Sequence, residues 1–318
     1  MKAVVIGGGS WGSVFAALLA ELGHEVALAC RDAAQAEAIA ATGRNPRYVP
    51  ECDLSAVRAT VLAGAPVAGA DLVCLAVPSR AFGAVAEGLP PDARLLGLAK
   101  GLDPETGSRL SQVVGARPVA VLSGPNHAEE IAQGLPAAAV IASEDEAFAL
   151  ELQHAIISTR FRVYVNADLV GVELCAAAKN VMALAAGGVD GFGFGDNAKS
   201  AVITRGLAEM TRLGEACGAR PETFAGLAGM GDLMVTCFSR YSRNRRAGEL
   251  MARGASPEEA QGEINMVVEG ITTAPVLRDL ARRLGVELPI TEAVCSVLEG
   301  TSATELVSGL MSRKPTDE

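Results

Sequence analysis

Short runs of apolar residues alternate with helical patterns between the N-terminus and about Val165. Each run is almost continuously apolar and lacks the polar alternation of a strand that has one face in water. Runs of this kind are typical of a parallel sheet that helices cover on both faces. The predicted strands are Ala3–Ile6, Glu25–Ala29, Leu72–Val77, Leu95–Ala99, Val119–Leu122, Ala138–Ala142 and Phe161–Val165. Their alternation with helices predicts a βαβ architecture.

The pattern changes to helical spacing after about Val165. The predicted helices of this half are Leu169–Ala186, Ala198–Cys217, Pro257–Gln261, Thr273–Leu284 and Thr291–Leu298. The sequence therefore predicts an α/β fold in which an N-terminal domain with a mostly parallel sheet, residues 1–170, precedes an all-α C-terminal domain, residues 171–318. The polar tail Ser312–Glu318 is predicted to fray.

Composition narrows the class of protein. The length of 318 residues suits two domains, and 50% hydrophobic residues are enough to build a core in each. With 27 basic and 37 acidic residues, the net charge of −10 argues against nucleic acid as a general partner, because backbone binding needs many Lys and Arg. The 7 cysteines form no CxxC pair, which predicts reduced thiols in a cytoplasmic protein without a metal centre.

The longest apolar stretch lies around Leu174–Val189 and contains Lys179 and Asn180. It is too interrupted for a membrane span, so we expect a buried helix and no membrane insertion.

Gly7, Gly9 and Gly12 form a G-x-G-x-x-G motif between the first predicted strand and the helical run Val14–Leu22. The three glycines permit a tight turn, close approach of the backbone to a pyrophosphate and close packing of helix on strand. The helix N-terminus supplies N–H groups for phosphates. The motif predicts a Rossmann-type dinucleotide-binding domain, and the alternative is a purely structural glycine turn.

The end of the second predicted strand reads Cys30-Arg31-Asp32. An acid at this place binds the ribose 2′-OH of NAD, whereas an Arg accommodates the 2′-phosphate of NADP. Arg31 therefore favours NADP, and Asp32 keeps NAD possible.

Lys179 occupies an apolar helix face, because its helical neighbours are Cys175, Ala176, Met182 and Ala183. Such a lysine either extends its ammonium past the core to water or is desolvated and able to exchange protons. The glycine-rich segment 187–197 that follows is predicted to line a cleft, which favours the functional interpretation.

A glycine turn and a basic cluster follow. Gly229-Met230-Gly231 is predicted to lead into a helix with Asp232 as its N-cap. Four arginines then fall within residues 240–246, among Ser and Asn. In an acidic chain this cluster favours a phosphate site over a structural salt-bridge network, and nucleic acid is the least favoured interpretation.

Taken together, the chain resembles the bacterial-type NAD(P)-dependent glycerol-3-phosphate dehydrogenases over nearly its whole length. The segments that carry the resemblance are Gly7–Gly12, Ala99–Leu102, Ser123–Pro125, Gly171–Asn180, Asn197–Lys199, Ile203–Gly206, Gly229–Leu233, Ser242–Arg246 and Val267–Gly270. The resemblance implies reversible reduction of dihydroxyacetone phosphate to sn-glycerol 3-phosphate, the backbone for phospholipid synthesis, with NADP or NAD as cofactor. A homodimer is the expected assembly.

Residue by residue, the resemblance implies catalytic roles for Lys179, Lys100 and Asp232, with Lys179 as the general acid/base. The implied cofactor-binding residues are Gly7, Gly9, Ser10, Trp11, Gly12, Arg31, Lys100, Ala128, Arg243, Val267 and Glu269. The implied substrate-binding residues are Lys100, Gly124, Asn126, Lys179, Asp232, Ser242, Arg243 and Asn244. The chain departs from the pattern at Asn126-His127, where many relatives carry Ser or Thr and then an apolar residue. The role of His127 stays open.

Two alternatives remain from the sequence. A β-hydroxyacid or 6-phosphogluconate type dehydrogenase also joins a dinucleotide fold to a helical domain with a lysine on a helix, although the Arg-rich segment fits it less well. A non-catalytic dinucleotide-sensing regulator would have degraded chemistry around Lys179 and Asp232, and both residues are present.

Overall fold

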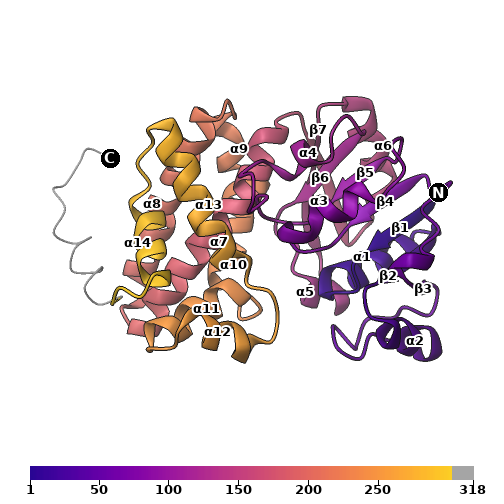
Figure 1. Cartoon of the computed structure of the whole chain (residues 1–318), viewed down its shortest axis with the longest axis horizontal. Coiled ribbons are helices and arrows are strands. Elements are labelled where there is room, and N and C mark those ends of the chain that lie inside the picture. Colours follow the sequence, from indigo (N-terminus) through magenta and orange to yellow (C-terminus); the bar gives the residue numbers. More distant parts are fainter. Residues whose placement is uncertain (303–318) are drawn as a thin grey trace. The chain divides into compact units, whose positions relative to one another are not determined.

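The computed structural model describes residues 1–302, and the predicted fraying of residues 312–318 lies outside this range. The chain divides into two compact units, Met1–Glu173 and the part from Leu174 onward. The first holds the strands and the second is helical (Figure 1).

The first unit contains one sheet of eight strands within the described residues, in the order β3-β2-β1-β4-β5-β6-β7-β8. The strands are β1 (Lys2–Ile6), β2 (Glu25–Cys30), β3 (Arg58–Val61), β4 (Leu72–Leu75), β5 (Leu95–Gly97), β6 (Val119–Ser123), β7 (Ala137–Ser143) and β8 (Phe161–Asn166). Neighbouring strands are parallel except β6 and β7, which pair antiparallel. The predicted fold class, with its mostly parallel sheet, is confirmed.

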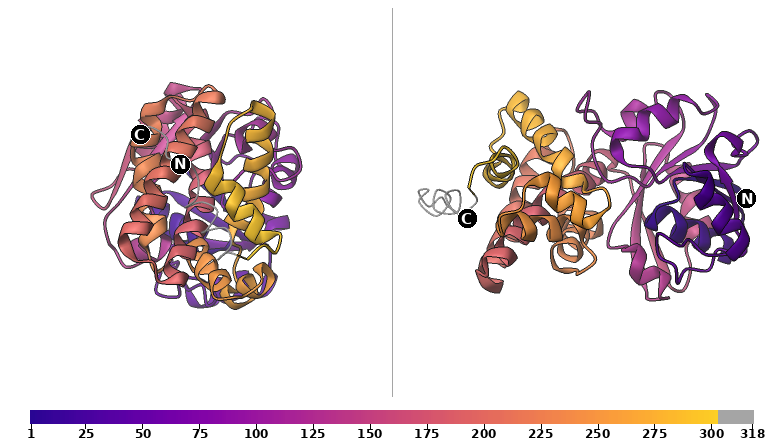
Figure 2. Two further views of the ribbon diagram at one scale, coloured as in Figure 1. Left: turned by 90° about the vertical axis from the view of Figure 1, so that its left-hand side faces the viewer. Right: turned by 60° about the horizontal axis from the view of Figure 1, so that its bottom comes forward.

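Helices cover both faces of this sheet (Figures 1 and 2). They are α1 (Ser10–Glu21), α2 (Ala33–Thr42), α3 (Ser79–Glu87), α4 (Leu110–Val113), α5 (Ala128–Ala132) and α6 (Glu146–Ile156), with a 3₁₀ turn η1 at Leu62–Gly64. Because strand side chains alternate between faces, Val5 joins the core that contains Phe15 of α1, and Val4 joins the core that contains Phe82 of α3. Both faces are thus buried, which explains the continuous apolar runs.

Strand β3 was not predicted from the sequence. Arg58–Val61 is short, its ends are exposed, and it forms the edge of the sheet. An edge strand needs fewer buried side chains, so its hydrophobic pattern is weak.

The second unit consists of helices and helical turns in its described part. They are the C-terminal portion of α7 (Leu169–Phe192), α8 (Gly195–Ala216), α9 (Pro221–Ala225), the π-helical turn η2 (Leu227–Gly231), α10 (Asp232–Phe238), α11 (Arg243–Ala252), α12 (Pro257–Ile264), α13 (Glu269–Leu284) and α14 (Pro289–Leu298). Helix α7 is long and apolar enough to span a membrane, but 89% of its most apolar window is buried inside the protein. It is a core helix, as the sequence predicted.

Most of the glycine-rich segment after Lys179 is helical. Helix α7 continues through it to Phe192, and Gly187 and Gly191 face α11. A Cβ at Gly187 would lie 1.8 Å from the carbonyl oxygen of Arg245, and one at Gly191 would lie 2.6 Å from that of Glu249. Glycine is needed at these two positions because two helix backbones approach closely.

Candidate active site

Several predicted site residues follow the carboxyl ends of parallel strands in the first unit. The glycine turn follows β1, Arg31 follows β2, Lys100 lies beyond β5 and Gly124 follows β6. Strands β1, β2, β4, β5 and β6 are mutually parallel, so these ends share one edge of the sheet. Strand order reverses at β1, and ligands of open α/β sheets bind at such a switch point.

The glycine turn has the shape that a pyrophosphate needs. Gly7 has a φ of +120°, and a Cβ at Gly12 would lie 1.9 Å from the Gly7 carbonyl oxygen, so α1 packs directly on the turn. At Gly9 a Cβ would meet nothing within 4 Å. The first turn of α1, which begins with Ser10 and Trp11, contains no acidic residue. The residues therefore fit an anionic dinucleotide, whose phosphates the N-terminal amides of α1 would hold.

Arg31 is exposed directly after β2, whereas Asp32 is the N-cap of α2. The Asp32 carboxylate accepts a hydrogen bond from the Ala34 N–H at 2.9 Å. Its structural role is thus a helix cap, which the sequence did not distinguish from a solvated charge.

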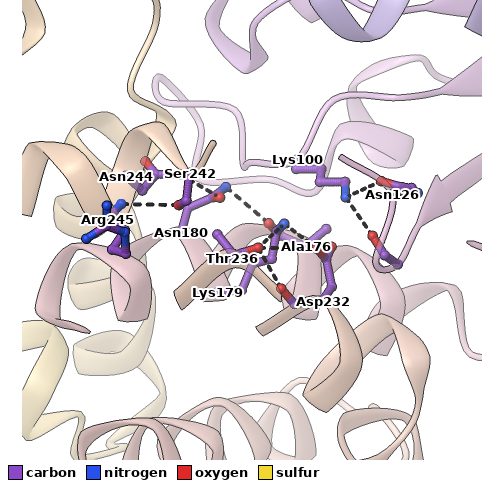
Figure 3. Close-up of polar contacts among 11 residues, drawn as sticks. Lys100, Asn126, Ala176, Lys179, Asn180, Asp232, Thr236, Ser242, Asn244 and Arg245 are labelled. Atoms are coloured by element: carbon purple, nitrogen blue, oxygen red, sulfur yellow. Dashed lines mark hydrogen bonds and ion pairs between the residues drawn. The ribbon is translucent and has the colours of Figure 1, made fainter. Parts of the chain in front are cut away.

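Lys100 and Asn126 meet in the first unit (Figure 3). The Lys100 ammonium donates to the Asn126 Oδ1 at 2.9 Å and to the Gly124 carbonyl at 3.1 Å. The Asn126 side chain is only 6% exposed, and its Nδ2 has no hydrogen-bond partner in the described part of the chain. Burying an amide donor without a partner is costly, so this Nδ2 is suited to a ligand acceptor. Ala128, two residues after Asn126, is the first residue of α5 and is buried.

Lys179 is the centre of the second group of residues, all of them in the helical unit. Its ammonium donates to the Asp232 carboxylate at 2.5 Å and to the Thr236 hydroxyl at 2.8 Å (Figure 3). Lys179, Asp232 and Thr236 are 5%, 1% and 3% exposed. Lys179 is therefore desolvated rather than extended to water, and its partner is a buried carboxylate.

Asp232 is not the N-cap that the sequence suggested. It is the first residue of α10, the preceding Gly231 makes no side-chain cap, and the Asp232 carboxylate bonds to Lys179 instead. The π-helical turn η2 leads directly into it, with the Gly231 N–H bonded to the Gly226 carbonyl. Such π-helical turns often occur at functional sites.

A chain of buried amides connects α7, α11 and α13, and Figure 3 shows its link between Asn180 and Asn244. Asn244 donates through Nδ2 to the Asn180 Oδ1 at 2.9 Å, and its own Oδ1 accepts from the Gly270 N–H at 2.8 Å. Ser242, the N-cap of α11, accepts from the Arg245 N–H. Asn180 follows Lys179 in α7, so the network fixes the start of α11 relative to the lysine.

The arginine cluster divides between the two interpretations that the sequence left open. Arg245 pairs with Asp190 at 2.8 Å and Glu249 at 3.0 Å, and Arg246 pairs with Glu263. These two arginines therefore serve a salt-bridge network, which corrects the prediction of one phosphate site over the whole cluster.

Arg243 differs from its neighbours. It is exposed, and its guanidinium donates to the Val267 carbonyl at 2.9 Å. This contact brings Arg243 to the segment that precedes Glu269 at the start of α13, so three of the predicted cofactor contacts lie together in the second unit.

Thr236 is a site residue that sequence reasoning missed. No motif singles it out, but it lies four residues after Asp232 in one helix and therefore on the same face. Its hydroxyl donates to the Asp232 carbonyl at 2.6 Å, which leaves its oxygen free to accept from Lys179.

The cysteines offer no reactive thiol among these groups. All seven are free and only Cys217 is partly exposed. Burial raises the pKa of Cys30 to about 11 and that of Cys237 to about 12, so both remain protonated at neutral pH. Among the described residues, no three His, Cys, Asp or Glu side chains are grouped to hold a metal ion.

The doubly wound sheet, the glycine turn at its switch point and the buried lysine–carboxylate pair define a dinucleotide-dependent oxidoreductase. Models of the N- and C-terminal parts of NAD-dependent glycerol-3-phosphate dehydrogenase match residues 2–149 and 168–308. The chain belongs to this family, and it is an NAD(P)-dependent enzyme.

Similar proteins extend over the full length. A glycerol-3-phosphate dehydrogenase of Moorella thermoacetica is 46% identical, with 99% of this chain and 96% of the relative covered. That of Streptomyces griseus is 47% identical, with 100% and 98% covered. The crystal structure of glycerol-3-phosphate dehydrogenase from Coxiella burnetii superposes with a TM-score of 0.93 at 36% identity, covering 98% of this chain and 99% of that one.

Proposed function

We propose that this protein catalyses the reversible reduction of dihydroxyacetone phosphate to sn-glycerol 3-phosphate, with Lys179 as the general acid/base. The observation that carries the proposal is the buried contact of Lys179 with Asp232 at 2.5 Å, in a chain that belongs to the glycerol-3-phosphate dehydrogenase family. The product would supply the glycerol backbone of phospholipids.

The nicotinamide cofactor, when bound, supplies or accepts the hydride. We propose that residues 1–170 bind it mainly through the glycine turn and that residues 171–318 carry the general acid/base and most of the substrate contacts. The proposed cofactor contacts are Gly7, Gly9, Ser10, Trp11, Gly12, Arg31, Lys100, Ala128, Arg243, Val267 and Glu269. The N-terminal amides of α1 hold the phosphates, and the positive charge of Arg31 suits a 2′-phosphate.

Lys179 supplies the proton that the carbonyl oxygen needs during reduction. The developing negative charge on that oxygen is stabilised by an ammonium placed beside it, and proton transfer to the oxygen yields the alcohol. In the oxidative direction the neutral amine removes the proton. The Asp232 carboxylate and the Thr236 hydroxyl bond the same ammonium and so fix its position. Lys100 adds a second positive charge for the substrate.

Substrate binding combines charged and neutral donors. We assign the phosphate to Arg243 and to the start of α11, where Ser242 and Asn244 lie, because guanidinium and helix N-terminus both favour anions. Asn126 contributes its buried, unpaired Nδ2 on the side of Lys100. Arg245 and Arg246 form ion pairs with Asp190 and Glu263, so we assign phosphate binding to Arg243 rather than to the whole cluster.

We further propose that the enzyme acts in the cytoplasm as a homodimer. Its free, mostly buried cysteines suit a reducing compartment, and twofold dimers are the commonest of the soluble homo-oligomers. Size-exclusion chromatography with light scattering tests the assembly.

The function is tested by initial rates with NADH and with NADPH, each with dihydroxyacetone phosphate, unphosphorylated dihydroxyacetone or ketones derived from β-hydroxyacids. Dihydroxyacetone phosphate is expected to be the preferred substrate. Equal use of dihydroxyacetone and its phosphate would refute the phosphate site. Preference for a hydroxyacid-derived ketone would place the chain with the hydroxyacid dehydrogenases, and cofactor binding without turnover would indicate a regulator.

A further inference from the structure

The carbonyl of Gly8, inside the glycine turn, is held by two side-chain amides. Gln35 of α2 donates to it through Nε2 at 2.6 Å, and Asn45 donates through Nδ2 at 3.0 Å. Gly8 itself is buried, and a Cβ there would lie 2.6 Å from the Cys30 sulfur. Neither amide belongs to the G-x-G-x-x-G motif, and both come from the segment between β2 and β3.

Asn45 is a fully buried hub. Its Nδ2 also donates to the Ser13 hydroxyl at 2.8 Å, in the second turn of α1. Its Oδ1 accepts from the backbone N–H groups of Arg47 and Tyr48 at 3.3 Å each, and from Gln35 at 3.2 Å. With 0% exposure, Asn45 thus ties the turn, the start of α1 and the 45–48 loop together.

Fixing the Gly8 carbonyl also fixes the amide of the next residue. The described chain has no cis peptide bonds, and in a planar trans peptide the N–H points opposite to the C=O. The carbonyl is drawn toward Gln35 and Asn45, so the Gly9 N–H is directed away from them. A Cβ at Gly9 would meet nothing within 4 Å, so the turn also has free space at this residue.

We propose that Gln35 and Asn45 are positioning residues of the cofactor site, which aim the Gly9 amide at the pyrophosphate by holding the Gly8 carbonyl. The inference rests on the proposed function, because it requires a dinucleotide at the turn. It adds two residues that act on cofactor affinity without touching the cofactor.

The test removes the donors and keeps the size of the side chain. Gln35→Met replaces the amide by an apolar chain of similar length at a partly exposed position. Asn45→Asp keeps the acceptor for Arg47 and Tyr48 but turns a carboxylate toward the Gly8 carbonyl. Gln153→Met is the matched control, because Gln153 of α6 also donates through Nε2 to a backbone carbonyl, that of Val163 at 2.9 Å, in the edge strand β8.

Dissociation constants for NADH, NADPH, ADP and adenosine are measured together with kcat, the KM for dihydroxyacetone phosphate and the melting temperature. Gln35→Met is expected to weaken binding of both dinucleotides and of ADP by about tenfold, while adenosine binding, kcat at saturating cofactor and the substrate KM stay unchanged. Gln153→Met should bind cofactor as the wild type does.

A purely structural role would lower the melting temperature of Gln35→Met and leave ADP binding intact, and that result would overturn the inference. Equal loss of ADP and adenosine binding would overturn it too, because the proposed effect is on the pyrophosphate. If Asn45→Asp does not fold, Gln35→Met decides alone. A wild type that binds neither NADH nor NADPH would refute the proposed function as well, whereas unaltered binding by Gln35→Met refutes only this inference.

Discussion

The Lys179 ammonium and the Asp232 carboxylate lie 2.5 Å apart, with side chains that are 6% and 2% exposed. Neither charge is solvated, so each depends on the other. Removing one partner of such a pair leaves an uncompensated buried charge and costs about 3–5 kcal/mol. A substitution that removes one of these charges is therefore compared with a second substitution of the same residue that keeps the charge.

Lys179→Ala should lower kcat by at least about a hundredfold, because general acid/base catalysis contributes that much or more. Lys179→Arg keeps the positive charge beside Asp232, but a guanidinium does not exchange its proton at neutral pH, so it should fold and lose similar activity. Initial rates and the dissociation constant for NADPH, which should be nearly unchanged, check this. A near-normal kcat in either variant would remove Lys179 from its role.

Arg243→Ala should raise the KM for dihydroxyacetone phosphate by roughly tenfold or more, since a charge-assisted hydrogen bond is worth about 1.5–3 kcal/mol. Arg246→Ala is the control, because Arg246 is exposed and its partner is Glu263 at 2.9 Å. The two substrate KM values are compared at saturating cofactor. Equal effects of both substitutions would mean that general positive charge, and not Arg243, binds the phosphate.

Arg31→Ala should weaken NADPH binding about tenfold or more and leave NADH binding almost unchanged, because only NADPH carries the 2′-phosphate. Arg58→Ala serves as control. Arg58 is also exposed, but it is the first residue of β3 and lies opposite Ala27. Arg31 lies beyond the other end of the same strand pair, where Cys30 is opposite Val61. Fluorescence titration with both dinucleotides measures the ratio. A parallel loss for NADH and NADPH would contradict a phosphate-specific role.

Asp190 should contribute a pH-dependent part of the stability. Partial burial alone would raise its pKa, but hydrogen bonds from Lys199 and Arg245 lower the pKa of Asp190 below its usual value. A lowered folded-state pKa adds stability above the unfolded-state value, and that stability is lost as the pH falls through the folded-state value.

Asp190→Asn should therefore lower the free energy of unfolding by about 1 kcal/mol near neutral pH, with allowance for screening, and by less below about pH 4. Urea unfolding at several pH values measures this. Asp279→Asn is the control, because Asp279 is 60% exposed and 3.6 Å from Arg278. A difference that grows in acid would contradict the sign.

Most strands were predictable because both faces of the sheet are buried, and such strands require unbroken runs of apolar residues. The antiparallel pairing of β7 with β6 was not predicted, since an apolar run such as Ala138–Ala142 looks the same in either direction. The short edge strand at Arg58 had too little buried surface to give a signal.

The candidate site was predictable where a residue type is unusual in its place. Lys179 on an apolar face required a partner, and the structure supplies Asp232. The division of the arginine cluster was not predictable, because the acids that pair with Arg245 and Arg246 lie on α7, α11 and α12. Thr236 and Asn45 carry no motif, and only the fold shows what their side chains contact.

Helix α7 carries Lys179 and, eight residues later, Gly187, on which α11 rests. At about 1.5 Å per residue, the two positions are about 12 Å apart along one rigid rod. The separation between Lys179 and the residues Ser242–Asn244 is thus set by this backbone contact together with the hydrogen bond between Asn180 and Asn244. A methyl group added at Gly187 would change that spacing and so alter substrate recognition, although Gly187 has no side chain that could contact a substrate.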